Sequence, residues 1–219
     1  MTSDVPFEPR LDVLPRPQRV LWDELGAVPE EFVLYGGTGL ALYLGHRQSV
    51  DFYFFGDKTF EPRQLAVQLP LLAGAAIIQQ APNTLGVILD RDGPVKLSFF
   101  GVPGLRRLRP PLIAAGNGLR VASLLDLAGT KASVVQQRAE AKDYIDIDAI
   151  LTDGRIGLAT ALAAARAIYG PSFNPLITLK ALSYFDDGDL ADLPPEIRLR
   201  LVAAARVVDP ARLPEVVSR

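Results

Sequence analysis

The 219-residue sequence contains no cysteine and a single histidine, His46. Without cysteine, it offers no disulfide, no thiolate zinc site and no cysteine nucleophile. With one histidine, it also lacks the several imidazoles of a histidine-based metal site. Any metal chemistry of this sequence must therefore rest on carboxylate oxygens, which its 25 Asp and Glu residues make available.

Long apolar runs and an excess of one charge are also missing. The longest apolar stretches, such as residues 69–78, reach about half of the ~20 residues that a helix needs to cross a bilayer. Residues 1–10 contain two acidic side chains and no apolar core, which is unlike a signal peptide. The net charge of −2 excludes a uniformly basic coat for nucleic acid. We therefore expect a cytoplasmic protein with no membrane partner.

The chain has the composition of a globular protein, and its 18 glycines and 18 prolines predict short elements. We expect an α+β architecture with a strand-containing core domain over residues 1–118 and a helical domain over residues 119–219. In the first part, the sequence predicts an irregular start over 1–17, helices at 18–25, 40–44 and 62–75 (broken near Pro70), strands at 32–35, 50–55, 77–79, 85–90 and 95–100, and a long loop over 101–118. In the second part, it predicts helices at about 123–138, 140–152, 157–169, 174–184 and 195–207.

A double glycine stands between a strand-like run and a short helix. The run 32–35 ends at Gly36, Gly37 and Thr38, and the helix follows at once. Glycine lets the backbone approach an anion closely, and the free N–H groups at a helix start favour phosphate. The alternative is a tight strand-to-helix turn that needs glycine for its shape. The pattern is not a Walker loop, because no Gly-Lys-Thr/Ser follows. It is not a Rossmann fingerprint either, because Leu42 stands where a third glycine is required.

Asp51 lies on the strand that follows this short helix. The order of glycine turn, helix and acidic strand resembles the nucleotidyltransferases of the DNA polymerase β type. More narrowly, it resembles the AbiEii branch, the toxin component of type IV toxin–antitoxin and abortive-infection systems. The matching motifs are Gly36-Gly37-Thr38, Gly45-His46-Arg47, Ser49 and Asp51, followed by Lys131, Arg138 and Lys142-Asp143-Tyr144-Ile145-Asp146. The resemblance covers roughly residues 14–200.

The resemblance implies a mixed sheet with flanking helices, a helical bundle after it, and Mg²⁺-dependent transfer of NMP from an NTP to an acceptor. In some relatives the acceptor is RNA or a tRNA 3′ end, and a cognate antitoxin is an implied partner. Two Mg²⁺ ions, held by an Asp-x-Asp pair and a third acid, clamp the attacking and leaving oxygens. The implied roles are metal binding for Asp51, phosphate binding for Gly36, Gly37, Thr38, Arg47 and Ser49, a nucleotide contact for Lys131, and an orienting or basic carboxylate for Asp143 and Asp146.

The sequence departs from this pattern at the metal ligands. Tyr53 stands where the second aspartate is required and points to the same face of the strand as Asp51. On the run 95–100, Lys96 and Ser98 share one face, and neither is acidic. Tyr53 is either native, which gives a very weak enzyme or a pseudoenzyme, or an introduced substitution that inactivates a toxic protein. The alternative function is a catalytically inactive module that binds a nucleotide or a protein.

Several other charged residues have a structural interpretation that involves no ligand. Lys131 also suits a lysine at the edge of a core, and Asp143 and Asp146 suit a solvated helix start, whereas Asp148 faces another direction. The remaining candidates are the arginine run 106–109, the hairpin-tip residues Asp90 and Asp92, and the acidic run 186–189, all expected to be solvated turns or loops.

Overall fold

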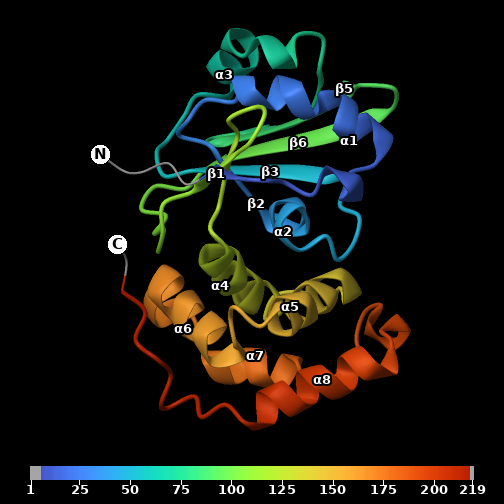
Figure 1. Ribbon diagram of the computed structural model, residues 1–219. Coiled ribbons are helices and arrows are strands. Elements are labelled where there is room, and N and C mark those ends of the chain that lie inside the picture. Colours follow the sequence, from blue (N-terminus) through green and yellow to red (C-terminus); the bar gives the residue numbers. More distant parts are fainter. Residues whose placement is uncertain (1–5, 218–219) are drawn as a thin grey trace. The chain divides into compact units, whose positions relative to one another are not determined.

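The structure is a computed structural model and describes residues 6–217. The described chain divides into two compact units (Figure 1). Unit 1 comprises the described residues up to Leu105 together with Pro110–Ser123, and unit 2 comprises Arg106–Arg109 and the described residues from Leu124 onward. The expected α+β architecture is confirmed, with strands in unit 1 and helices in unit 2. Residues 1–5 of the expected irregular start lie outside the described residues.

Unit 1 is built on a mixed sheet in which the described strands follow the order β1-β7-β8-β2-β3-β6-β5-β4. Strand β3 lies near the middle, antiparallel to β2 and parallel to β6. The strands are β1 (Pro6–Phe7), β2 (Val33–Tyr35), β3 (Asp51–Gly56), β4 (Ala76–Ala81), β5 (Thr84–Asp90), β6 (Pro94–Gly101), β7 (Leu112–Ala114) and β8 (Arg120–Val121). The helices of this unit are α1 (Arg16–Leu21), α2 (Gly36–Leu44) and α3 (Pro62–Gln68), with 3₁₀ turns at Leu11–Val13, Trp22–Ala27 and Pro70–Leu72.

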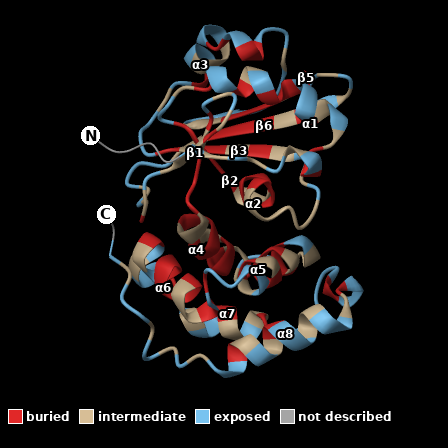
Figure 2. Cartoon of the chain, viewed as in Figure 1, coloured by how far each residue is buried: buried red, intermediate tan, exposed pale blue. Residues whose placement is uncertain are grey.

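Alternation along β3 separates the core of unit 1 from its candidate site. Phe52 and Phe54 are fully buried and pack with Phe99 of β6, whereas Asp51 and Tyr53 are half-buried on the opposite face. Figure 2 shows buried positions along β3 and β6. Side chains on successive strand residues point to opposite faces of the sheet. Because Phe52 and Phe54 face the core, Asp51 and Tyr53 must lie on the other face, where they can contact a ligand.

Unit 2 consists of helices that pack through small and apolar side chains. Its helices are α4 (Leu124–Val134), α5 (Ala141–Asp153), α6 (Leu158–Tyr169), α7 (Pro175–Ala181) and α8 (Pro195–Arg206), with 3₁₀ turns at Gly170–Ser172 and Leu190–Asp192. Helix α6 buries a run of small residues, Ala161 and 163–165, so that other helices of the unit can approach it closely. No helix in residues 6–217 is long and apolar enough to cross a membrane.

Several expected boundaries were wrong. The helix expected at 40–44 begins at Gly36, directly after β2, and the helix expected to reach residue 138 ends at Val134. The loop expected over 101–118 contains β7, whose short, half-buried run carries little strand signal. Strand β8 pairs with β2 through Leu34 and Val121, and residues 119–123 accordingly belong to unit 1. The expected division into domains at residue 118 stays a prediction.

Candidate functional site

The glycine turn joins β2 to α2, and both glycines are in close contact with side chains. Gly36 has φ +76°, in the left-handed region that favours glycine, and a Cβ there would lie 3.3 Å from the ring of Tyr53. A Cβ on Gly37 would overlap Nη2 of Arg47 and lie 3.3 Å from Oγ of Ser49. The missing side chains therefore let Arg47 and Ser49 pack directly on the turn at the start of α2. Amide N–H groups of a helix start and an arginine are both suited to an anion.

Thr38, in the first turn of α2, is completely buried. Its Oγ1 donates a hydrogen bond to the carbonyl oxygen of Asp51 at 2.5 Å and lies 2.8 Å from Oγ of Ser49. The hydroxyl that the sequence predicts to bind phosphate is thus bonded to the first residue of β3. What the structure shows for Thr38 is a positioning contact, which ties the glycine turn to the backbone that carries Asp51.

Asp51 and Tyr53 lie side by side on β3, as the sequence predicts. The Tyr53 hydroxyl donates to Oδ2 of Asp51 at 3.2 Å. The Tyr53 ring stacks along the sheet on Phe100 of β6, with centroids 6.3 Å apart and planes at 21°. Tyr53 therefore occupies the expected place of a second carboxylate and, through its hydroxyl, uses part of the acceptor capacity of the first.

The same face of the sheet extends onto β6 without a further acid. In the parallel register, Asp51 lies beside Lys96 and Tyr53 beside Ser98. The next strand, β5, places Ile88 beside Lys96 and Gly86 beside Ser98. Within residues 6–217, no group of three or more His, Cys, Asp or Glu is arranged to hold a metal ion.

These side chains do not fit the two-metal centre that the resemblance implies. Mg²⁺ takes oxygen ligands, above all carboxylates, and a neutral phenol with a pKa near ~10 is a poor substitute. The face offers one carboxylate, Asp51, next to a phenol, a hydroxyl and an ammonium. A metal-binding role of Asp51 stays a prediction, and no reaction step is routed here through a metal.

In unit 2, the second predicted motif forms a buried ionic cluster. Lys131 of α4 is 5% exposed, and its Nζ lies 2.6 Å from Oδ1 of Asp143 and 2.5 Å from Oδ2 of Asp146, both on α5 and fully buried. Arg138, in the connection between the two helices, donates from Nε to Oδ2 of Asp143 at 2.7 Å. Positions 143 and 146 face the same side because they are three residues apart on a helix. Two cations thus meet two carboxylates inside unit 2.

The environment of Asp143 keeps its carboxylate charged. Burial alone would raise the pKa of Asp143. The hydrogen bond from Arg138, the positive charge of Lys131 and the hydrogen bond from Lys131 together outweigh burial and hold this pKa below its usual range. A carboxylate with a lowered pKa and three donors on its two oxygens is a weak base. These contacts make Asp143 poorly suited to act as a base, and its predicted role as an orienting carboxylate stays a prediction.

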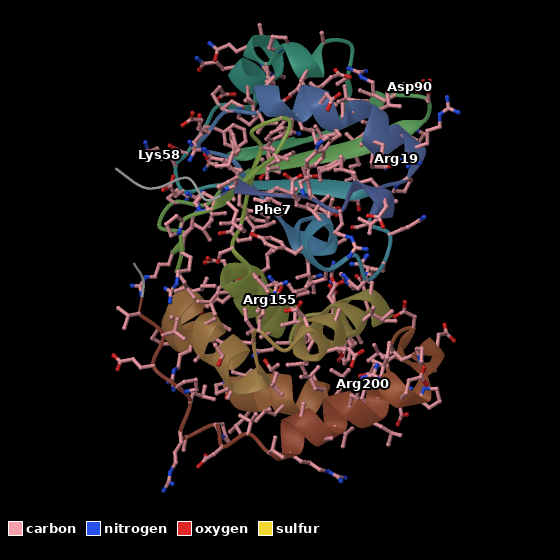
Figure 3. All side chains as sticks on the ribbon, in the orientation of Figure 1. Phe7, Arg19, Lys58, Asp90, Arg155 and Arg200 are labelled. Carbon is pink, nitrogen blue, oxygen red and sulfur yellow. The ribbon has the colours of Figure 1, made fainter. Side chains whose placement is uncertain are left out.

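Other acidic candidates have local partners. Both oxygens of Asp148 accept from Arg200 of α8 at 2.7 Å, so its side chain points away from the Lys131 cluster, as expected. Asp90 lies at the tip of the β5–β6 hairpin, where Oδ1 accepts from the amide of Gly93 at 2.9 Å (Figure 3). Asp92 of the same tip forms an exposed ion pair. These residues stabilise turns and helix contacts.

The arginine run 106–109 is not the simple solvated loop that was expected. Leu108 is 1% exposed and packs in an apolar cluster with residues of α6. The buried carboxylate of Asp126 accepts from the amides of Leu108 at 2.8 Å and Arg109 at 3.2 Å. Sequence reasoning missed this role of Asp126 because the two amides precede it by 18 and 17 residues. The one sequence signal that could have indicated a bound carboxylate was its position in the first turn of a helix.

The acidic run 186–189 is a loop, as expected, but Asp189 has a specific partner. Its Oδ1 accepts from the amide of Ala141 at 2.6 Å, which caps the N-terminus of α5. Sequence reasoning missed this contact, since 48 residues separate the two positions. The loop therefore helps to fix the start of the helix that carries Asp143 and Asp146.

Comparisons with known proteins agree with this fold. The family model of the nucleotidyltransferase AbiEii toxin of type IV toxin–antitoxin systems matches residues 19–215. An uncharacterised protein of Aquifex aeolicus (strain VF5) is 30% identical over 164 residues, which cover 72% of this chain and 75% of that protein. MenT4, a nucleotidyltransferase toxin of Mycobacterium tuberculosis H37Rv, superposes with a TM-score of 0.59 at 14% identity over 87% of this chain and 83% of its own. A protein from H. pylori, described provisionally as a nucleotidyltransferase, gives a TM-score of 0.54 at 17% identity over 87% and 92% of the two chains.

The mixed sheet, the glycine turn before α2 and the acidic strand β3 define a nucleotidyltransferase-type fold, which these structures share. Since the family model spans most of the sequence, the chain belongs to the AbiEii family of nucleotidyltransferase toxins of type IV toxin–antitoxin systems.

Proposed function

We propose that this chain binds the triphosphate of a nucleotide at the glycine turn and transfers NMP to an acceptor far more slowly than a protein with a complete Asp-x-Asp pair. One observation supports the binding. Arg47 and Ser49 pack on Gly37 in the first turn of α2, where the backbone N–H groups have no partner within the helix. An arginine and a row of N–H donors at one point form an anion site. We expect a slow rate because Tyr53, a neutral phenol, stands where the family pattern has its second carboxylate and donates its hydroxyl to Asp51.

A transfer assay tests this function. Labelled NTPs are incubated with total RNA or tRNA and the purified chain, its Asp51→Ala variant and its Tyr53→Asp variant. We expect weak incorporation by the unmodified chain, none by Asp51→Ala, and an increase of about tenfold or more by Tyr53→Asp with Mg²⁺, since each tenfold in rate corresponds to 1.36 kcal/mol. Transfer that survives Asp51→Ala would place the activity elsewhere. Calorimetry with Mg²⁺ and each NTP gives the matching binding data, and no gain by Tyr53→Asp there would argue against a metal site at this position.

A nucleotide-binding module without transfer activity is the second candidate function. It is favoured by the hydrogen bond from Tyr53 to Asp51 and by the lack of a further acid on the described face. Binding of an NTP without measurable transfer, unchanged by Tyr53→Phe, would support this module over the slow enzyme.

The remaining family features are proposals for this chain. They are an RNA or tRNA acceptor, a cognate antitoxin, and nucleotide contacts by Lys131, Asp143 and Asp146. Co-expression with the product of a neighbouring gene, scored by growth, tests the antitoxin. Lys131→Arg tests the nucleotide contact, because it keeps a cation in the cluster but changes its reach.

A further inference from the structure

Lys96 and Ser98 are the residues of β6 on the face that carries Asp51, and neither of them supplies a third acid. Lys96 is the register partner of Asp51 in the parallel pair of β3 and β6, where neighbouring strands lie about 4.8 Å apart. The two side chains share the face that also presents Tyr53 and Ser98. A cation therefore stands beside the one carboxylate of this face of the sheet.

The Lys96 ammonium has no partner within the part of the chain that the structure describes. No hydrogen bond or ion pair there reaches it, although the residue is half-buried. Asp51 accepts instead from Tyr53. The neighbours of Lys96 on β5 and β6 are Ile88 and Ser98, which carry no charge. Because no carboxylate of the described residues pairs with this ammonium, it is available to an anionic ligand.

The same arrangement disfavours a divalent cation. An ammonium next to Asp51 repels Mg²⁺ by the same Coulomb interaction that attracts phosphate. Lysine offers three N–H donors at the end of a flexible stem and binds phosphate as a compact charge. Lys96 can therefore supply the positive charge that a metal ion supplies in a complete centre.

We propose that this chain binds the triphosphate of its nucleotide without a divalent metal, and that Lys96 takes the place of the metal ion as the cation on the sheet face. This inference rests on the proposed nucleotide binding and deepens it. The ligand class is a metal-free polyphosphate, and Lys96 is a binding residue that contacts its oxygens. No bond is made or broken in this step.

The first experiment measures binding with and without metal. Calorimetry with ATP, and separately with inorganic tripolyphosphate, is run in EDTA and in MgCl₂. We expect both ligands to bind in EDTA with an affinity at least equal to that in MgCl₂, where Mg²⁺ competes for the phosphates. Tripolyphosphate isolates the phosphate contacts from those of the base. Binding that requires Mg²⁺ overturns the inference and leaves the proposed nucleotide binding intact.

The second experiment assigns the charge to Lys96. Lys96→Gln keeps most of the stem and removes the charge, and we expect it to weaken tripolyphosphate binding in EDTA about 10- to 100-fold, the range of one charge-assisted hydrogen bond. Lys96→Arg restores most of the affinity. The matched control is Lys58→Gln, since Lys58 is an exposed lysine of the same unit beyond the end of β3 (Figure 3). Equal losses from Lys58→Gln and Lys96→Gln would indicate general screening and overturn the assignment.

A converse variant rebuilds the acidic pattern. Tyr53→Asp with Lys96→Asp places three carboxylates on adjacent positions of β3 and β6. We expect this double variant to lose binding in EDTA and to regain it in MgCl₂, which reverses the metal dependence. Circular dichroism confirms that it folds; if it does not, Lys96→Gln alone decides. If the unmodified chain binds no nucleotide in either buffer, the proposed function and the inference both fail.

Discussion

The two units of this protein use their charged residues in opposite ways. In unit 2, Lys131 is almost fully buried and lies within 2.6 Å of the carboxylates of both Asp143 and Asp146. In unit 1, Asp51 and Lys96 are half-buried register partners, and no ion pair between them is recorded in the described residues. The first arrangement is closed and internally compensated, whereas the second leaves charge facing solvent.

This difference indicates what each group of charges is for. Removing ions from water is costly, and a buried cluster is tolerated only when each ion is paired with good geometry. Such a cluster fixes α4 against α5, and a nucleotide contact by Lys131 would have to compete with these ion pairs. In unit 1, the half-buried Lys96 is available to exchange water for phosphate. We therefore expect substitutions in unit 2 to lower stability first, and those in unit 1 to lower ligand binding first.

Breaking the buried cluster gives the largest expected effect. Lys131→Met keeps the apolar stem but leaves Asp143 and Asp146 without their shared ammonium. We expect the free energy of unfolding of unit 2 to fall by about 3–5 kcal/mol, the usual cost of removing one partner of a buried pair. Urea unfolding followed by circular dichroism measures it.

The matched control is Lys142→Met on the same helix as the two aspartates. Lys142 is 53% exposed and pairs with Glu140, so we expect a change within about 0.5 kcal/mol. Adding Asp146→Asn to Lys131→Met removes an uncompensated charge and should recover part of the loss. If Lys131→Met is as stable as Lys142→Met, the cluster does not hold the helices, and the contrast between the units fails.

Thr38→Val gives the next largest effect and tests unit 1. The substitution keeps the shape but removes the hydrogen bond to the Asp51 carbonyl, and we expect a loss of about 1–3 kcal/mol from a buried acceptor left unsatisfied. Nucleotide affinity should fall as well, because the start of β3 is no longer tied to the glycine turn. The control is Thr130→Val in α4, whose hydroxyl donates to the Leu127 carbonyl in its own helix. A nucleotide affinity that is unchanged in Thr38→Val would contradict the positioning role.

Local sequence signals predicted the parts of the fold that depend on short-range physics. The strands around 50–55, 85–90 and 95–100 and the later helices were found because apolar periodicity and turn residues specify them within a few positions. Strand β7 was missed because its three-residue run carries little signal, although it pairs with the nearby β8 as well as the distant β1. The cap that Asp189 places on Ala141 was missed because its two partners lie 48 residues apart. Long-range pairing leaves little trace in a window of ten residues.

In the candidate site, too, local features were predicted and long-range contacts were not. Tyr53 beside Asp51 follows from the period of a strand and was predicted, and the hydroxyl contact confirms it. The position of Lys96 directly beside Asp51 did not follow, because the register between β3 and β6 is set by the packing of the whole sheet. The pairing of Lys131 with both Asp143 and Asp146 also required the structure, since it depends on how α4 and α5 pack.

The smallest expected effect is a difference in acid sensitivity between two aspartates of unit 2. The pKa of Asp143 in the folded state lies below its value of about 3.9 in an unfolded chain, so its ionisation contributes stability above pH ~4 that is lost as the pH falls through the folded value. The hydrogen bond from Arg155 lowers the pKa of Asp153 in the same direction, but this pair is exposed and its contribution is screened by solvent. We therefore expect Asp143→Asn to flatten the fall of unfolding free energy between pH 5 and pH 2 more than Asp153→Asn does, as measured by urea titrations at each pH. Equal flattening by the two variants would show that burial of the Lys131 cluster adds nothing to its charge interactions.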